Sequence, residues 1–217
     1  MEWRLLADVP PEDVRRVLEI PRRRRFDRNE AVFHRDDPGD SLHLIVKGRF
    51  AIRVMTPVGD TATIAVRGPG ESFGEMALVT ESARRAATVA ALEAAETFAV
   101  YQADFHRLRQ EHPAVNQVLI SFLAGEVRML NERLLEALYV PAERRVLRRL
   151  RELAELYPHG EGSVLIPLTQ EEIASLAGTS RATVNAVLRE EEKRGTVELA
   201  RGKTIVRELG ALAKRAR

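Results

Sequence analysis

Cysteine is absent from the 217-residue sequence. Its absence excludes disulfide scaffolds, thiolate zinc sites, cysteine-ligated iron–sulfur clusters and cysteine nucleophiles. Apolar runs of the roughly 18–20 residues that cross a bilayer are absent as well. Residues 1–8 lack the basic start and apolar core of a signal peptide, so we expect a cytoplasmic protein with no membrane partner.

Clusters of metal ligands and catalytic groups are also missing. The five histidines are scattered, and no His-x-His or His-Glu-x-x-His unit occurs. No nucleophile stands beside a base in a recognisable pattern. We therefore predict no metal site and no enzymatic activity, and we expect His34 and His43 to be partly buried structural residues.

A charge excess is missing from the whole chain but not from its C-terminal part. The 34 Lys and Arg nearly balance the 32 Asp and Glu, which leaves a net charge of +2. Residues 140–217 hold 15 Lys and Arg against 11 Asp and Glu, whereas the rest of the chain is slightly acidic. This local surplus agrees with a polyanionic partner for the C-terminal part.

Two patterns of hydrophobicity divide the chain. From residue 26 to residue 101, short alternating apolar runs separated by glycine predict strands at 42–46, 50–54, 61–66 and 94–100. From residue 103 onward the period is mostly helical. The fold class predicted is α+β: an N-terminal antiparallel β-roll, similar to a jelly roll, with flanking helices, one of them at 11–18. The arginine run at 22–25 is interpreted as solvated surface, with a nucleic-acid patch as the alternative.

A long helix is predicted over 113–139. One apolar stripe has alternating spacings of three and four residues, which is the pattern of two helices packed side by side; it comprises Ile120, Leu123, Val127, Leu130, Leu134 and Ala137. A second stripe could face the roll: Val115, Val118, Phe122 and Met129. Two stripes favour a homodimer over an ordinary buried helix. Pro141 ends the helix and is expected to be the hinge, so we divide the chain at 1–112, 113–140 and 141–217.

The C-terminal part predicts a winged helix-turn-helix. Thr169 and Glu172 form a capping box, Gly178 permits a tight turn, and Ser180 is a good N-cap for a second helix. Apolar residues that should face inward are Ile173, Leu176, Ala177, Val184, Val187 and Leu188. A hairpin over residues 197–206 would be the wing. The alternative is a helical hairpin that serves packing only.

The second helix should present one face to the major groove of double-stranded DNA. Its outward residues are predicted to be Arg181, Ala182, Asn185, Ala186 and Arg189. Arg181 and Asn185 are the candidate base readers, because arginine suits guanine and asparagine suits adenine. Phosphate contacts set position and much of the affinity; the candidates are Gln170, Thr179, Ser180, Thr183 and Lys203.

Residues 70–78 and 82–89 predict an anion site in the roll. Gly74 lets a ligand approach the backbone, and exposed amides around Glu75, Met76 and Ala77 can donate to an anion. Arg85 offers a planar fork for phosphate oxygens, while Glu75 can accept from a ribose hydroxyl. The alternative is a structural ion pair between Glu75 and Arg84 or Arg85.

The run Phe73-Gly74-Glu75 followed by Arg85 resembles the phosphate-binding cassette of cyclic-nucleotide-binding domains. Together with the long helix and the winged helix, the chain resembles the catabolite activator protein/FNR family of bacterial transcription regulators. The resemblance implies cyclic AMP as the effector, with Glu75 on the ribose 2′-hydroxyl and Arg85 on the cyclic phosphate. It also implies a homodimer on a pseudo-palindromic operator, with RNA polymerase as a candidate partner.

The sequence departs from the family pattern at several positions. Ala86 replaces the usual Ser or Thr, and Asn131 is the best polar candidate for a base contact from the long helix. Ala182 and Ala186 stand where base readers are frequent. Three functions stay open: a cyclic-AMP-controlled regulator, a regulator of the same family with no effector or a different one, and an enzyme or nucleotide buffer. The FNR-type iron–sulfur sensor is excluded by the lack of cysteine.

Overall fold

The structure is a computed structural model that describes residue 15 and residues 22–56, 59–79, 84–113, 115–158 and 162–216. The chain forms two compact units. The first comprises Met1–Thr61 and Ala65–Leu130, and the second comprises Ala62–Ile64 and Asn131–Arg217. Of the helix predicted at 11–18, only residue 15 is described, and it is helical; the rest of this segment lies outside the described residues.

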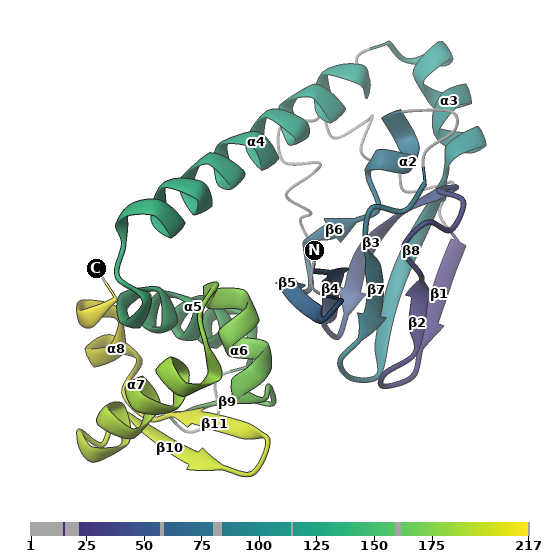
Figure 1. The fold of residues 1–217 in the computed structure, drawn as a ribbon. Coiled ribbons are helices and arrows are strands. Elements are labelled where there is room, and N and C mark those ends of the chain that lie inside the picture. The colour runs from purple at the N-terminus through teal and green to yellow at the C-terminus, as the bar shows by residue number, and fades with distance from the viewer. Residues whose placement is uncertain are drawn as a thin grey trace. The chain divides into compact units, whose positions relative to one another are not determined.

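Two four-stranded antiparallel sheets make up the roll (Figure 1). One has the order β1-β8-β3-β6 and the other has the order β2-β7-β4-β5. Their strands are β1 (Arg22–Phe26), β2 (Ala31–Phe33), β3 (Ser41–Lys47), β4 (Phe50–Met55), β5 (Thr61–Arg67), β6 (Ser72–Phe73), β7 (Thr88–Ala91) and β8 (Ala95–Tyr101).

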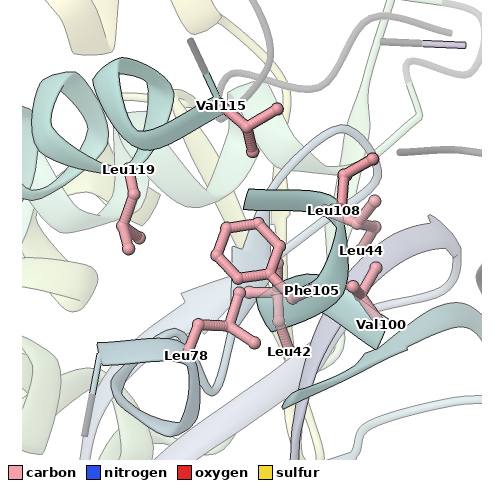
Figure 2. Packing of buried hydrophobic residues seen from close by; sticks show 8 residues of the cluster. All are labelled: Leu42, Leu44, Leu78, Val100, Phe105, Leu108, Val115 and Leu119. Atoms are coloured by element: carbon pink, nitrogen blue, oxygen red, sulfur yellow. The ribbon is translucent and has the colours of Figure 1, made fainter. Parts of the chain in front are cut away.

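The alternation of side chains along β3 explains why this strand is buried on both faces. Ile45 belongs to an apolar cluster whose members come from strands of both sheets, namely Phe26, Phe50, Phe73, Val89, Ala91 and Ala95. Leu42 and Leu44 belong to a second cluster, shown in Figure 2, with side chains from three helices. These helices are α2 (Met76–Val79), α3 (Gln102–Glu111) and α4 (Val115–Tyr139). Strand β3 is therefore the central element of the roll.

The four predicted strands are confirmed as β3, β4, β5 and β8. The arginine run is exposed, as predicted, but it is strand β1 rather than a surface stretch before the roll. Arg23 and Arg25 both donate to Glu96 on the neighbouring strand. This cross-strand charge pairing lets an arginine run adopt an edge strand. The prediction for His34 is wrong, since it is exposed, whereas His43 is only 4% exposed.

Helix α4 ends at Tyr139, and α5 (Ala142–Leu156) begins directly after Pro141, as expected. Several large apolar side chains on α4 are more than half exposed, among them Ile120, Val127, Leu130, Leu134, Leu135 and Leu138. By contrast, Val115 is buried in the roll core and Phe122 packs against it. Leu123, predicted for the first stripe, packs against this core as well. The helix thus has one packed face and one apolar face exposed in the single chain.

The second unit contains a helix-turn-helix with a three-stranded sheet of order β10-β11-β9. Its remaining elements are β9 (Val164–Ile166), α6 (Gln170–Ala177), α7 (Arg181–Lys193), β10 (Val197–Ala200), β11 (Lys203–Val206) and α8 (Leu209–Arg215). The capping box and the Ser180 N-cap are confirmed, and Gly178 has the left-handed φ of 59° that its turn requires. Of the residues predicted to face inward, only Leu176 is half-buried and the others are buried.

The joint between α4 and α5 is crossed by ion pairs and hydrogen bonds. Glu136 on α4 pairs with Arg148 and Arg149 on α5. Arg145 donates to the Val140 carbonyl at 2.9 Å and also to the carbonyls of Ala177 and Gly178. The end of α4 and the helix-turn-helix are therefore held by shared contacts. No helix within the described ranges combines the length and the apolar character that crossing a membrane requires.

Candidate functional site

Arg85 is a buried cation in the roll, with 6% of its surface exposed. Its Nη1 donates to the Ser41 carbonyl at 2.6 Å, and its Nη2 donates to Asp40 Oδ1 and Ser41 Oγ, both at 3.0 Å. The guanidinium lies 4.0 Å from the centre of the Phe33 ring. Burial, the largest effect, lowers the pKa of Arg85, while Asp40 opposes this shift.

The Nε of Arg85 is buried and finds no hydrogen-bond partner within the described part of the chain. A buried donor left unpaired is costly, so a bound acceptor at this nitrogen would be stabilised. The guanidinium can therefore offer a hydrogen bond to a bound anion.

Gly74 makes room for this arginine. Its φ is +85°, and a Cβ added there would lie 2.8 Å from Arg85 Nη1 and 2.9 Å from the Ser41 carbonyl oxygen. Any larger residue would push the guanidinium away. The glycine predicted from the sequence to admit a ligand thus has a second role, which is to admit Arg85. An anion contact fits this arrangement of glycine, arginine and unpaired Nε.

Glu75 follows directly and is half-buried. Burial raises its pKa, and the nearby Glu126 raises it further, while Arg67 lowers it. Arg85 forms its ion pair with Asp40, and Arg84 donates to the Asp36 carbonyl. Within the described residues neither arginine forms an ion pair with Glu75, so the ion-pair alternative is not what the structure displays. The Glu75 carboxylate can accept a hydrogen bond from a sugar hydroxyl.

The other predicted effector residues differ in accessibility. Met76 is 47% exposed, whereas Ala77 is buried and its amide already donates to the Gly74 carbonyl at 3.2 Å. Ala86 is exposed next to Arg85. Asn131 is exposed on α4 and belongs to the second unit, whereas the other effector candidates belong to the first.

Asp40 and Ser41 are the site residues that sequence reasoning missed. They lie in and before β3, 44 to 45 residues from the arginine that they bind. No spacing or motif connects residues that distant, so the sequence carried no signal for this contact. The structure brings them together because β3 and the cassette meet in one layer of the roll.

The outward face of α7 agrees with the predicted recognition face. Arg181, Ala182, Asn185, Ala186 and Arg189 are all exposed, and Val184, Val187 and Leu188 are buried. This division follows from helical periodicity and a single buried stripe. Among the described residues, Arg181 has no ion-pair or hydrogen-bond partner for its side chain, whereas Arg189 donates to Glu192 at 2.8 Å.

Several candidate phosphate contacts already make hydrogen bonds within the unit. Ser180 Oγ accepts from the Thr183 amide at 3.2 Å and lies 3.0 Å from Thr183 Oγ1. Gln170 Nε2 donates to Asn185 Oδ1 at 3.4 Å, which links the start of α6 to the recognition face. Thr179 is half-buried, and its amide donates to the Ala174 carbonyl. These side chains are positioned by the fold before any DNA arrives.

Lys203 is exposed at the start of β11, directly after the hairpin turn. Gly202 in that turn has a φ of +70°, which lets the two strands connect tightly. The hairpin register pairs Ala200 with Lys203. The wing predicted from the sequence is therefore present with its lysine at the tip.

Two protein families match the chain. Residues 23–112 match the cyclic nucleotide-binding domain, and residues 144–215 match the Crp-like helix-turn-helix domain. The cassette and the recognition face described above each lie within one of these matches.

Relatives cover nearly the whole length. The chain is 35% identical to the cyclic AMP receptor protein of Thermus thermophilus over 96% of this chain and 94% of that protein. It is 33% identical to a CRP-like cAMP-activated global transcriptional regulator of Mycobacterium tuberculosis, over 88% of this chain and 87% of that protein.

Solved structures agree with this. The catabolite activator protein of Thermus thermophilus is 32% identical, with 98% of this chain and 97% of that chain covered and a TM-score of 0.56. The c-di-GMP responsive global regulator CLP of Xanthomonas campestris is 21% identical and shares the fold, with a TM-score of 0.73 over 91% of this chain and 99% of that one. Since the domain order, the fold and the full-length relatives agree, the chain belongs to the CRP/FNR family of transcription regulators.

Proposed function

We propose that the protein is a homodimeric transcription regulator controlled by a cyclic nucleotide, cyclic AMP first, which binds in the roll. The observation that carries the proposal is the buried Arg85 with its unpaired Nε beside the glycine that makes room for it. Relatives named for cyclic AMP support the choice of nucleotide.

In this proposal Arg85 and Glu75 divide the ligand between them. Arg85 would donate to the cyclic phosphate, and Glu75 would accept from the ribose 2′-hydroxyl. Gly74, Met76 and Ala77 would line the turn beside the phosphate. Ala86 would offer its backbone but no hydroxyl. The Asp40 carboxylate already accepts a hydrogen bond from Arg85 Nη2. An incoming phosphate would therefore share this nitrogen with Asp40 or displace the carboxylate from it.

The exposed apolar face of α4 supports the homodimer. Ile120, Val127, Leu130 and Leu134 follow one another at spacings of seven, three and four residues. Each is 55–60% exposed in the single chain. That spacing is the one by which two helices interlock along a shared stripe. The occupant we propose is α4 of a second copy, and Asn131 at the edge of this stripe would then face the partner's nucleotide.

The proposed dimer would place two recognition faces on a pseudo-palindromic operator. Arg181 and Asn185 would read base edges beside the small Ala182, and Arg189 would contact the DNA once released from Glu192. Gln170, Thr179, Ser180, Thr183 and Lys203 would contact phosphates. RNA polymerase stays a predicted partner, and binding assays with the purified polymerase on promoter DNA test it.

For the nucleotide to act as a switch, it must bind two arrangements of the protein unequally. The division proposed for the chain is a roll at 1–112, a dimer helix at 113–140 and a DNA-binding domain at 141–217. Movement at Pro141 would have to break the contacts of Glu136 and Arg145 across the joint. Those contacts would contribute to the free-energy difference that the ligand must supply.

Calorimetric titration with cyclic AMP, cyclic GMP and cyclic di-GMP tests the effector. We expect heat with cyclic AMP, and its loss in Arg85→Leu. Arg84→Leu is the matched control, because Arg84 is exposed and makes one backbone hydrogen bond. Arg85→Lys keeps the charge without the fork and should retain only weak binding.

Absence of heat with every nucleotide at millimolar concentration, from protein that still binds DNA, would overturn the effector proposal. The result would favour the alternative regulator that acts without a cyclic nucleotide. The sequence observation behind that alternative is the long helix, where Asn131 is only the best polar candidate for a contact with the base. Heat with cyclic di-GMP alone would assign a different effector to the same site.

A further inference from the structure

Arg67, the last residue of β5, connects the cassette region to the long helix. Its Nη1 donates to Glu71 Oε1 at 3.1 Å, and its Nη2 donates to Glu126 Oε2 on α4 at 2.9 Å. The Arg67 side chain is 13% exposed, and that of Glu126 is 27% exposed. Both contacts are therefore charge-assisted hydrogen bonds in a largely desolvated position, where they are stronger than at the surface.

Glu71 links Arg67 to the turn that precedes the cassette. Its Oε2 accepts from the Gly68 amide at 2.8 Å, and its backbone carbonyl accepts from the Ile45 amide at 2.9 Å. Glu71 is followed at once by β6 and then by Gly74. Arg67 thus holds the turn from which the cassette begins.

Glu75 is sensitive to the same two charges. Burial raises its pKa, Glu126 raises it further, and Arg67 lowers it. Arg67 thus forms ion pairs with Glu71 and Glu126, and its charge also acts on Glu75. A ligand hydroxyl that donates to Glu75 would therefore act on a carboxylate that Arg67 and Glu126 both influence.

Packing alone does not explain an arginine at this position. The Nε of Arg67 is buried and has no partner in the described part of the chain. A well-packed apolar residue would avoid the desolvation cost of the guanidinium. This desolvation cost suggests that Arg67 fixes the arrangement of its neighbours rather than adding to the stability of the fold.

We propose that Arg67 is a positioning residue that couples the nucleotide cassette to α4 through Glu126. The part of this proposal that concerns ligand response rests on the proposed function, whereas the bridge itself can be tested without a ligand.

Hydrogen exchange in the absence of nucleotide tests the bridge. We expect Glu126→Met, a change on α4, to speed amide exchange at residues 74–78 by about tenfold, as the loss of one charge-assisted hydrogen bond predicts. Glu132→Met is the matched control, since Glu132 is an exposed carboxylate on the same helix. Unchanged exchange at 74–78, or equal acceleration over the whole roll, would overturn the bridge.

The ligand response is measured as the ratio of DNA dissociation constants without and with cyclic AMP. Coupled proteins typically show ratios of roughly 5 to 150. We expect Arg67→Met to bring this ratio close to one while cyclic AMP still binds, and Arg67→Lys to restore part of it. A full wild-type ratio in Arg67→Met would overturn the coupling role. Failure of the wild type to bind any nucleotide would instead overturn the proposed function, and the exchange result would still decide the bridge.

Discussion

Burial decides the chemistry of single residues in the roll, and His43 shows it most directly. The imidazole is stacked on Phe73, with 5.0 Å between ring centres and 7° between ring planes. Its Nδ1 lies 3.0 Å from Thr97 Oγ1. Burial first, then the positive charges of Arg85 and Arg24, lowers the pKa of His43 from 6.5 to about 3, against the opposing effect of Asp40. The ring is therefore neutral in the folded protein at neutral pH.

This shift predicts a pH dependence of stability. The unfolded chain binds a proton at His43 near pH 6.5 and the folded chain only near pH 3, so the stabilisation is complete above pH 6.5 and is lost as the pH falls toward 3. From pH 7 to pH 5 we expect the free energy of unfolding to fall by about 2 kcal/mol from this group alone. Urea denaturation at both pH values measures it.

His43→Gln should remove most of that fall, because glutamine keeps a hydrogen-bonding group but does not titrate. His34→Gln, which changes an exposed histidine, is the control for the substitution itself. An equal fall with pH in His43→Gln and the wild type would show that His43 does not cause it.

At the residue scale, a sequence supports a prediction where a residue's role depends on its near neighbours. Gly74, Glu75 and Arg85 lie within twelve positions of one another, and their chemistry could be stated from residue type alone. The partners of Arg85 could not, because Asp40 and Ser41 reach it only through strand pairing. The contact of Asp40 with the Arg85 guanidinium is visible only in the folded chain.

Local signals also explain which elements were predicted well. The capping box of Thr169 and Glu172 and the turn at Gly178 involve residues at most four positions apart, and both are present. Strands β2, β6 and β7 have only two to four residues, too few for an alternating pattern to emerge. The arginine run in β1 was misassigned for another reason, since its pairing with Glu96 is a tertiary contact.

At the scale of elements, the exposed apolar face of α4 leads to a prediction about the oligomeric state. A helix that leaves Leu130 60% exposed and Leu134 58% exposed loses the stabilisation of roughly 25 cal/mol per Å² that burial of apolar surface provides. A second copy of the same face would recover it for both chains. We therefore expect Leu134→Glu to convert the dimer into a monomer in sedimentation velocity.

Arg128→Glu is the matched control for this prediction. It introduces the same side chain at an exposed position of α4 that lies outside the alternating apolar stripe. The control should stay dimeric. A wild-type protein that sediments as a monomer would refute the prediction before any variant is made. A Leu134→Glu variant that stays dimeric would show that the interface lies elsewhere.

At the scale of the whole molecule, the proposed two-fold dimer would constrain the DNA that it can bind. Each recognition face reads one half-site, and the two half-sites must lie on the same side of the duplex, about 10–10.5 base pairs apart from centre to centre or a multiple of this distance. The charge distribution agrees with DNA binding by the C-terminal part, since the basic surplus lies in residues 140–217.

Changing the separation of the half-sites tests the constraint. We would select operators from random oligonucleotides with and without cyclic AMP, and then insert five base pairs at the centre of the selected site. The insertion turns one half-site by about half a helical turn, so only one recognition face can bind at a time. Affinity should fall by roughly 10³-fold or more, toward the non-specific level, because specific sites exceed non-specific ones by at least this factor.

A ten-base-pair insertion is the control, since it restores the rotational alignment while increasing the distance. It should recover affinity only if the dimer can widen, and comparing it with and without cyclic AMP measures how strongly the nucleotide fixes the distance between the two recognition helices. Equal affinity for the original and the five-base-pair sites would mean that each chain binds DNA alone, and the dimer would then have no part in operator choice.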